Sequence, residues 1–450
     1  MNNSTTKKLS VFYTIWIGQL VSLFGTAMTR FAVIVWAYQQ TNTVMTLGWL
    51  GFFGYVPYIL TSPIAGVLID RWDRRKILII TDGLAGFITI FMLIQFLTGN
   101  LAIWHLFLAE GLTSVLEAFQ IPAFNASITL LVNKKDYTRA NSLFSIANDA
   151  AKIFAPIFGG LLLSMSNLST IFAVDIVTFL IAMLTLLFIR IPQLKSRQLS
   201  HLSISGWWNE NSEAARFIKD RKGLLAILLV YLNINFFAAL TYFCILPALI
   251  LARTGGDQFA LGTVQGFLGI GGLIGGIILA IWGGPKKKVY GFLFATGASF
   301  LFGDFLFATG QNIIIWSIGA FVSTIFIPLI NSNSLAIWQL KVPPDMQGRV
   351  FALRSMGQTA VMPIGFLLGG WLADNVFEPL FKQPSPFFNW FSPIVGSGPG
   401  AGMGFMFLIT CLFGFLTAIV GFASSAVRNI ESDLPDFDFS EPIVNPISSD

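Results

Sequence analysis

Long apolar stretches separated by short polar connections run along almost the whole chain. Each stretch has about 20 residues or more, the length at which a helix crosses a hydrocarbon layer about 30 Å thick. Backbone polar groups in lipid must be satisfied within their own segment, so each stretch is predicted to be a helix. We expect twelve spans, at 11–39, 44–69, 77–98, 102–131, 141–164, 169–190, 223–251, 258–282, 288–309, 311–338, 349–374 and 402–424. The pattern predicts an all-α polytopic membrane protein.

The connections between spans alternate between basic and nearly uncharged. Of the 27 Lys and Arg residues, 23 fall on one side of this alternation. Arg253 and Lys382 fall on the other side, and Arg30 and Lys152 lie inside spans. Lys and Arg next to a span are retained on the cytoplasmic face. We therefore expect a multi-pass protein of the plasma membrane, the inner membrane of a bacterium, with both termini in the cytoplasm.

Composition agrees with a membrane location. The 450 residues are 55% hydrophobic and 11% charged, whereas a soluble domain carries about 25% charge. The net charge of +5 comes from short basic clusters beside spans, which favours membrane topology over a nucleic-acid partner. Cys244 and Cys411 both lie in apolar runs, so no disulfide framework is expected. No cofactor and no metal are predicted.

The chain divides into two similar halves. At a separation of 210 residues, Arg139, Leu143, Gly159 and Gly160 match Arg349, Leu353, Gly369 and Gly370. We predict bundles at 1–190 and 223–424, a cytoplasmic linker at 191–222 and an acidic, disordered tail at 425–450. These are two pseudo-symmetric six-helix bundles, a recurring plan of transporters, with the substrate site between the halves.

Two connecting segments carry further expectations. In the linker, Ser212 could cap a short helix from Glu213 whose apolar side lies on the lipid headgroups; the alternative is a plain linker. The connection 375–401 is rich in aromatic residues, Pro and Gly. An anchor at the membrane interface is expected there, with a lid as the alternative.

Residues 66–76 read Gly-Val-Leu-Ile-Asp-Arg-Trp-Asp-Arg-Arg-Lys, between the second and third spans. This segment resembles the Gly-xxx-Asp-Arg-xx-Arg-Arg loop of the major facilitator superfamily. Over about residues 9–425 the chain looks most like drug and siderophore exporters related to macrolide-efflux proteins. The resemblance implies a gating loop that begins at Gly66, in which Asp70 and Arg71 help to lock the outward-facing state. Arg74 and Arg75 would then contact helix ends or lipid.

The loop departs from the family pattern at two points. Asp73 stands where the family has Gly, and Ala280 stands where the second copy of the loop would have Asp. The alternative interpretation is that the cations from Arg71 onward only fix the topology.

Small residues on the fifth and eighth spans suit close packing between the halves, because the resemblance implies that these two helices face each other. Both a sliding interface and static packing fit such a surface. The residues are Pro156, Gly159, Gly160, Gly271 and Gly275.

Several ionisable residues lie deep inside spans, where charge is costly and points to function. Arg30 and Glu110 lie about nine and about eight residues from the outer ends of their spans, which border the central cavity in this family. We expect them to form an ion pair. Asp149 and Lys152 are three residues apart and share a helix face, and Glu117 is expected to reach Lys152.

A proton-coupled exporter needs a carboxyl group that takes up a proton and is reset when a cation or water reaches it. Glu117 and Asp149 are the candidates. The alternative is an ion-pair network that only holds the first, fourth and fifth spans together. Asp175 and Asp304 are expected near the outer surface on peripheral helices, as structural residues.

Amide side chains on the fourth, seventh and tenth spans are expected to face the central cavity. With 45 Phe and 12 Trp in the chain, the cavity should be largely apolar and suited to a bulky amphipathic compound. The amides are Asn125, Asn233, Asn235, Asn331 and Asn333.

The predicted function is secondary active export of an amphipathic drug, siderophore or peptide-like compound, by rocking of two halves and in exchange for protons. We expect a monomer. An importer or uncoupled facilitator of the same fold is the first alternative. A membrane-embedded enzyme is disfavoured, because the two histidines, His105 and His201, form no HExxH and no GxSxG is present. The chain has no GxxxxGK[ST] for ATP, and its polar segments are too short for the extramembrane domain of a receptor.

Overall fold

The computed structural model describes residues 3–69, 72–132, 137–188 and 204–436. Within these ranges the chain folds into helices and contains no strand. The first half consists of six long helices: α1 (Asn3–Thr41), α2 (Val44–Ile69), α3 (Arg74–Leu97), α4 (Ile103–Leu131), α5 (Tyr137–Met165) and α6 (Leu168–Phe188). Each matches one predicted span.

The second half contains six further spans, several of them made of more than one segment. They are α8 (Lys222–Ala238) with η2 (Ala239–Ile245) and α9 (Leu246–Thr254); α10 (Gln258–Trp282); α11 (Lys288–Ala298) with η3 (Ser299–Asp304) and α12 (Phe305–Thr309); α13 (Ile313–Ile325) with α14 (Ile327–Lys341); α15 (Pro344–Ala360) with α16 (Met362–Leu372), η4 (Ala373–Phe377) and α17 (Glu378–Leu380); and α19 (Ala401–Ala423).

Two of these spans are interrupted next to prolines. Pro328 and Pro363 lie in the first turns of α14 and α16, where a residue without an N–H cannot continue the hydrogen-bond ladder of the preceding helix. The segments η2, η3 and η4 are π-helical. This geometry is rare in proteins overall, and where it occurs it is often found at functional sites.

The predicted twelve-span fold is confirmed for the described residues. Eleven helical stretches are long and apolar enough to cross a membrane. The remaining span of the twelve is the fourth, α4, which has 29 residues and carries Glu110 and Glu117.

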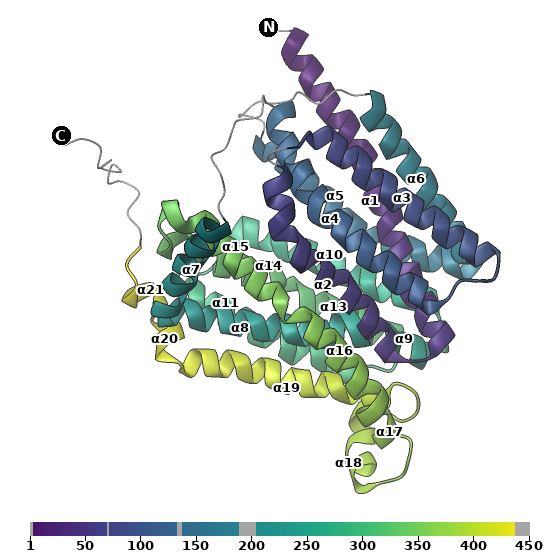
Figure 1. Ribbon diagram of the computed structural model, residues 1–450. Coiled ribbons are helices and arrows are strands. Elements are labelled where there is room, and N and C mark those ends of the chain that lie inside the picture. The colour runs from purple at the N-terminus through teal and green to yellow at the C-terminus, as the bar shows by residue number, and fades with distance from the viewer. Residues whose placement is uncertain (1–2, 70–71, 133–136, 189–203, 437–450) are drawn as a thin grey trace.

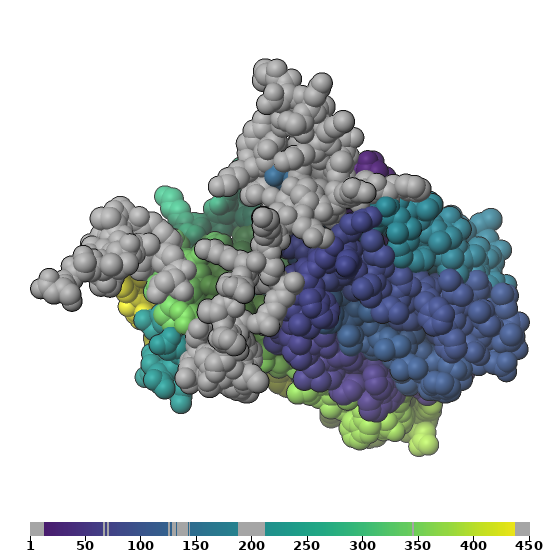
Figure 2. Space-filling view, turned by 45° about the horizontal axis from the view of Figure 1, so that its top comes forward, coloured from purple at the N-terminus to yellow at the C-terminus, as the bar shows by residue number. Residues whose placement is uncertain are grey.

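The two halves contact each other along equivalent helix pairs. In Figure 1, α2 lies beside α16 and α5 beside α10, and these are the main contacts between the halves. They join the second span to the eleventh and the fifth to the eighth, as a duplicated arrangement requires. In the space-filling view of Figure 2, the purple-to-blue first half fills the right of the molecule, and the greens of the second half lie to the left and along the lower edge.

Among the described residues, the halves share a hydrophobic core at one end of the molecule only. We call the end with α7 (Ile204–Asp220), α20 (Ser425–Arg428) and α21 (Ile430–Asp433) the terminal end, and the end with α17 and α18 (Pro386–Val395) the distal end. At the distal end one hydrophobic cluster combines Val44 and Leu47 with Leu249 and Phe366.

At the terminal end each half has its own hydrophobic cluster. One cluster contains Ile69 and Leu78 of the first half, and the other contains Ile227 and Trp338 of the second. The hydrophobic core therefore joins the halves at the distal end and is divided between them at the terminal end.

Glycines permit the close approach of the halves. A Cβ atom on Gly160 of α5 would lie 2.5 Å from the carbonyl oxygen of Gln258, and one on Gly48 of α2 would lie 2.7 Å from that of Phe366. Both distances are too short for any larger residue without movement of the backbone.

Other glycines predicted at this interface lie elsewhere. Gly271 and Gly275 pack against the backbone of α13 inside the second half, and Gly159 packs against Phe31 of α1. The α10 face that meets α5 contains Gly262 and Gly266 instead. The glycines of α10 therefore form two faces, one toward α5 and one toward α13. Which face meets α5 depends on the orientation of α10 about its axis, and the sequence pattern does not determine that orientation.

The linker helix differs from its prediction. Ser212 lies inside α7, which starts at Ile204, so it caps nothing at Glu213. Phe217 and Ile218 are buried in the hydrophobic cluster of the second half. The apolar side of α7 therefore packs on protein rather than on lipid headgroups.

The start of the predicted disordered tail is ordered over residues 425–436. Val427 and Ile430 are buried in the same hydrophobic cluster. The Glu431 carboxylate accepts the backbone N–H groups of Lys288 and Val289, both at 3.1 Å, and so caps α11. Lys341 forms an ion pair of 2.8 Å with Asp436. Residues 437–450 lie outside the described residues.

Candidate functional site

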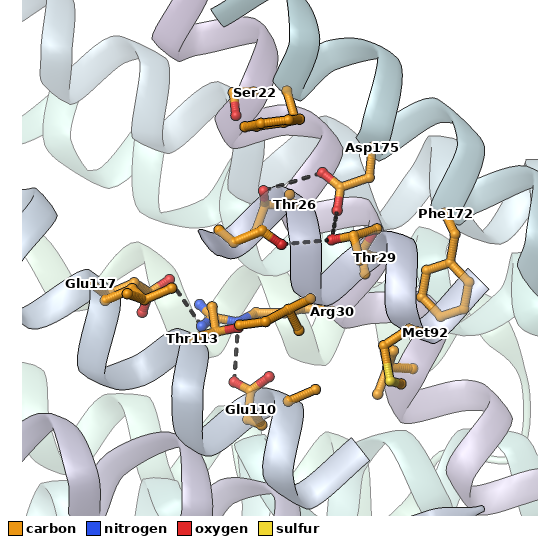
Figure 3. A pocket seen from close by; sticks show the side chains of 18 of the residues that line it. Ser22, Thr26, Thr29, Arg30, Met92, Glu110, Thr113, Glu117, Phe172 and Asp175 are labelled. Atoms are coloured by element: carbon orange, nitrogen blue, oxygen red, sulfur yellow. Dashed lines mark hydrogen bonds and ion pairs between the residues drawn. The ribbon is translucent and has the colours of Figure 1, made fainter. Parts of the chain in front are cut away.

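A polar pocket lies inside the first half, between α1, α3, α4 and α6. Its volume is about 100 Å³, room for a few water molecules. Figure 3 shows Arg30 near its centre, with Glu110 and Glu117 on one side and Asp175 on another. Its further polar lining residues are Ser22, Thr26, Thr29, Asp82, Thr89, Thr113 and Gln120.

Arg30 bridges two glutamates of α4. Its Nε lies 3.2 Å from Oε1 of Glu110, and its Nη2 lies 2.9 Å from Oε1 of Glu117. The glutamates are seven residues apart, two helical turns, so they point the same way from α4. The side chains of Arg30, Glu110 and Glu117 are 39%, 22% and 26% exposed. The ion pair expected between Arg30 and Glu110 is thus present, between side chains that are partly exposed.

The predicted link from Glu117 to Lys152 is absent, because Glu117 is held by Arg30. Lys152 instead lies 3.6 Å from Asp149 on its own helix, and these two side chains are 72% and 48% exposed. The two groups proposed for proton coupling therefore lie in different surroundings: Glu117 in the polar pocket and Asp149 on an exposed face of α5.

Asp82 is a site residue that sequence reasoning missed. It is buried in α3 and accepts a hydrogen bond of 2.9 Å from the Gln19 amide and another from the Gln120 amide. The sequence signal that could have identified it was its position, as an acidic residue at the sixth place of the predicted span 77–98. In the described part of the chain its partners are neutral donors.

Asp175 is buried and lines the same pocket. Its carboxylate accepts from the hydroxyl groups of Thr26 at 3.2 Å and Thr89 at 3.1 Å. These hydroxyls come from α1 and α3, so Asp175 of α6 joins three helices around the pocket.

Asp304 is also buried, inside the second half. It accepts from the hydroxyl of Thr410 at 2.5 Å and from the hydroxyl of Tyr242. Tyr242 belongs to η2 and Asp304 ends η3. Two π-helical segments therefore meet at one buried carboxyl group.

The gating loop is described only in part. Asp70 and Arg71 lie outside the described residues, as do the surroundings of Gly66. Asp73 caps α3 by accepting the Arg75 backbone N–H at 2.9 Å, and Arg74 is the first residue of that helix. The Asp that replaces the family's Gly therefore starts the third span.

Arg75 contacts the end of a neighbouring helix. Its guanidinium donates to the carbonyl oxygens of Leu186 at 3.1 Å and Leu187 at 2.9 Å, in the last turn of α6. A cation is favourable there because the last carbonyls of a helix have no partners within the helix.

Two of the amides predicted for the cavity serve packing within the second half. Asn235 donates to the Gln358 carbonyl oxygen at 2.7 Å and ties α8 to α15. Asn333 is buried and faces Gly291 of α11. The prediction that Asn333 faces the cavity is therefore wrong, because the rotation of α14 turns it toward α11.

The other predicted amides are exposed or outside the described residues. Asn331 accepts a hydrogen bond of 2.5 Å from the Tyr231 hydroxyl, and Asn233 donates to the carbonyl oxygen of Leu229 in its own helix at 2.9 Å. Both are exposed. The side chain of Asn125 lies outside the described residues.

Arg354 is a buried cation that the sequence reasoning counted only as a topology residue. It lies on α15 and donates to the Ser334 hydroxyl at 3.1 Å. Its guanidinium carbon lies 5.9 Å from the Tyr231 ring and 5.5 Å from the Trp338 ring. Two aromatic faces and a hydroxyl therefore hold this charge in the described part of the second half.

Asp374 links the halves at the distal end. Its carboxylate accepts the backbone N–H groups of Val44 at 2.9 Å and Met45 at 2.8 Å, the first residues of α2. Nearby, the Gln39 amide donates to the Gly256 carbonyl oxygen at 3.3 Å. We call these contacts, together with the shared core, the distal seal.

The chain is similar to known membrane transporters. It is 29% identical to Macrolide efflux protein A of Streptococcus pyogenes over 369 residues, which cover 81% of this chain and 90% of that protein. It is 24% identical to the Staphyloferrin A transporter of Staphylococcus aureus, over 80% of this chain and 86% of that protein.

Solved structures support the fold. The nucleoside transporter NupG matches with a TM-score of 0.68 at 13% identity, over 92% of this chain and 98% of that one. A bacterial homologue of the iron transporter ferroportin, in an inward-facing state, matches with a TM-score of 0.64 at 16% identity, over 92% and 98%. The family model described as Major Facilitator Superfamily matches residues 15–366. The chain therefore belongs to the Major Facilitator Superfamily and is a multi-pass membrane transporter, not an enzyme.

Proposed function

We propose that the protein exports an amphipathic small molecule across the plasma membrane by alternating access, in exchange for protons, and that it works as a monomer. The observation that carries the proposal is the ion-pair triad of Arg30, Glu110 and Glu117 in the polar pocket. Ionisable groups at this depth are rare unless they serve transport. The similarity to Macrolide efflux protein A supports the direction.

The division of the core supports alternating access. Lys and Arg beside the spans gather at the terminal end, which by the positive-inside rule is the cytoplasmic side. The distal seal then closes the outer side, while the described hydrophobic clusters of the two halves stay separate toward the cytoplasm. This is an inward-facing arrangement.

Protonation of the triad provides a coupling step. When a proton binds one of the two glutamates, Arg30 loses one of its two anionic partners and the link between α1 and α4 weakens. The proton leaves when the pocket returns to the other state and Arg30 is paired twice again. Asp149 remains a second candidate for coupling, on an exposed face that water reaches.

Inside-out membrane vesicles test the proposal. We expect a radiolabelled macrolide to accumulate in vesicles that contain the wild-type protein, and dissipation of the proton gradient to stop this accumulation. Uptake that does not depend on the gradient and stops when the compound has equilibrated would indicate an uncoupled facilitator. The absence of accumulation for a panel of amphipathic compounds would contradict export.

A further inference from the structure

An apolar groove lies on the lipid-facing side of the polar pocket, between α3 and α4. Its volume is about 240 Å³. Leu84 and Phe87 of α3 and Leu108 and Leu112 of α4 line it, and all four side chains are exposed. At the distal end, His105 lies against the Phe91 ring and accepts the Ala102 backbone N–H at 2.9 Å. The groove is therefore open to the acyl chains of a surrounding bilayer.

The groove and the polar pocket share a thin partition. Ile88, Ala109 and Leu116 line both spaces. The next residue after each of them lines the polar pocket: Thr89, Glu110 and Glu117. Each helix therefore turns an apolar face to lipid and a polar face to the pocket, and the methyl group of Ala109 is the smallest barrier between them.

The charges of the pocket select the kind of head group. In the described lining, four carboxyl groups (Asp82, Glu110, Glu117 and Asp175) face one cation, Arg30. Asp82 and Asp175 are held there by amide and hydroxyl donors alone. An ammonium group complements this surplus of acids, whereas an anion would be repelled.

We propose that the groove is a lateral access site for substrate: the apolar chain of an amphipathic amine lies in the groove while its ammonium group passes the partition into the polar pocket. This inference rests on the proposed function and adds the route and the charge of the substrate. A chain gains little by leaving lipid for the groove, because lipid is equally apolar. Affinity therefore comes from the head group, whose charge is costly in the bilayer and compensated in the pocket.

Fluorescence quenching in lipid nanodiscs tests the site with a defined probe. A bimane label is placed on a Leu112→Cys variant, since native Cys244 and Cys411 are buried. The probe is dodecylamine brominated at carbons 6 and 7, and the neutral control is dodecanol brominated at the same carbons. We expect the amine to quench saturably and the alcohol only in proportion to its concentration in lipid. A bimane on Leu412→Cys of α19, which is also lipid-exposed, should show only proportional quenching with either compound.

Filling the partition provides the matched variant. Ala109→Phe should weaken saturable quenching by the amine by about tenfold or more, since overfilling a packed space commonly costs that much. Ile90→Phe, on an exposed position of α3 that lines neither space, should leave it unchanged. Ala109→Val should fall between the two, and a thermal melt identifies a variant that has simply unfolded.

Equal quenching by the amine and the alcohol, or equal behaviour at Leu112→Cys and Leu412→Cys, would overturn the site. Binding is measured without transport, so the two proposals fail separately. Saturable binding without accumulation in vesicles would contradict export alone. Accumulation with no saturable quenching would contradict the lateral route alone.

Discussion

The Asp374 carboxylate accepts the Val44 backbone N–H at 2.9 Å, so a residue of the second half caps the first turn of a helix in the first half. The first N–H groups of a helix have no partners within the helix and attract negative charge. The Asp374 side chain therefore joins the two halves at the distal end through backbone atoms, and it must leave those atoms whenever that end opens.

Replacing this cap should loosen the distal seal. Asp374→Ala is expected to cost about 1 kcal/mol of the closed arrangement, the usual value of such a cap. Cys244, whose thiol lies 3.4 Å from the Phe366 carbonyl oxygen within the seal, should then react faster with a small maleimide. Asp374→Asn retains an acceptor for the cap and should react more like wild type. An unchanged rate in Asp374→Ala would show that the cap does not hold the seal.

The triad should behave as a coupled unit. Arg30→Gln leaves two carboxylates without their cation, and Glu110→Gln removes one partner from Arg30. We expect each to lower vesicle accumulation and stability, by about 1–3 kcal/mol for such half-buried pairs. The double variant should lose less than the sum of the single losses. Simple additivity in thermal unfolding would mean that the contact contributes nothing.

Gly160 should tolerate no side chain. Gly160→Ala places a methyl group against the carbonyl oxygen of Gln258 and should push α5 from α10, with loss of the closed distal arrangement and of transport. Gly272→Ala is the matched control on α10, because its Cβ would meet no atom within 4 Å. If both variants accumulate substrate like wild type, the close approach of α5 and α10 is not required.

The buried carboxyl group of the second half should be a stability determinant. Tyr242→Phe removes a hydroxyl that donates to Asp304, and leaving a buried acceptor short of a partner costs about 1–3 kcal/mol. We expect a lower melting temperature with unchanged dependence of transport on the proton gradient. A changed gradient dependence at normal stability would instead assign Asp304 to coupling.

The number and position of the spans were predictable because the length of an apolar run is a property of the sequence alone. The pairing of Arg30 with Glu110 was predictable for a related reason: each lies at a similar depth in its own helix. Depth did not identify the partner of Glu117, since the rotation of α4 directs it to Arg30 and away from Lys152.

Features that depend on helix rotation and docking were not predictable. Asn333 and Gly271 lie on the right helices but on faces that turn inward within the second half. Asp374 gains its role only when α16 docks beside α2. Asp82 could have been predicted as a site residue, because an acidic residue inside an apolar span can be recognised in the sequence.

The docking of α7 and of residues 425–436 onto the second half has a mechanical consequence. When one half rotates against the other, these segments move together with the second half. A reporter dye attached at Ser432 would therefore track that half, and a dye at Trp72 would track the other. The distance between the two dyes would then follow the transport cycle at the terminal end.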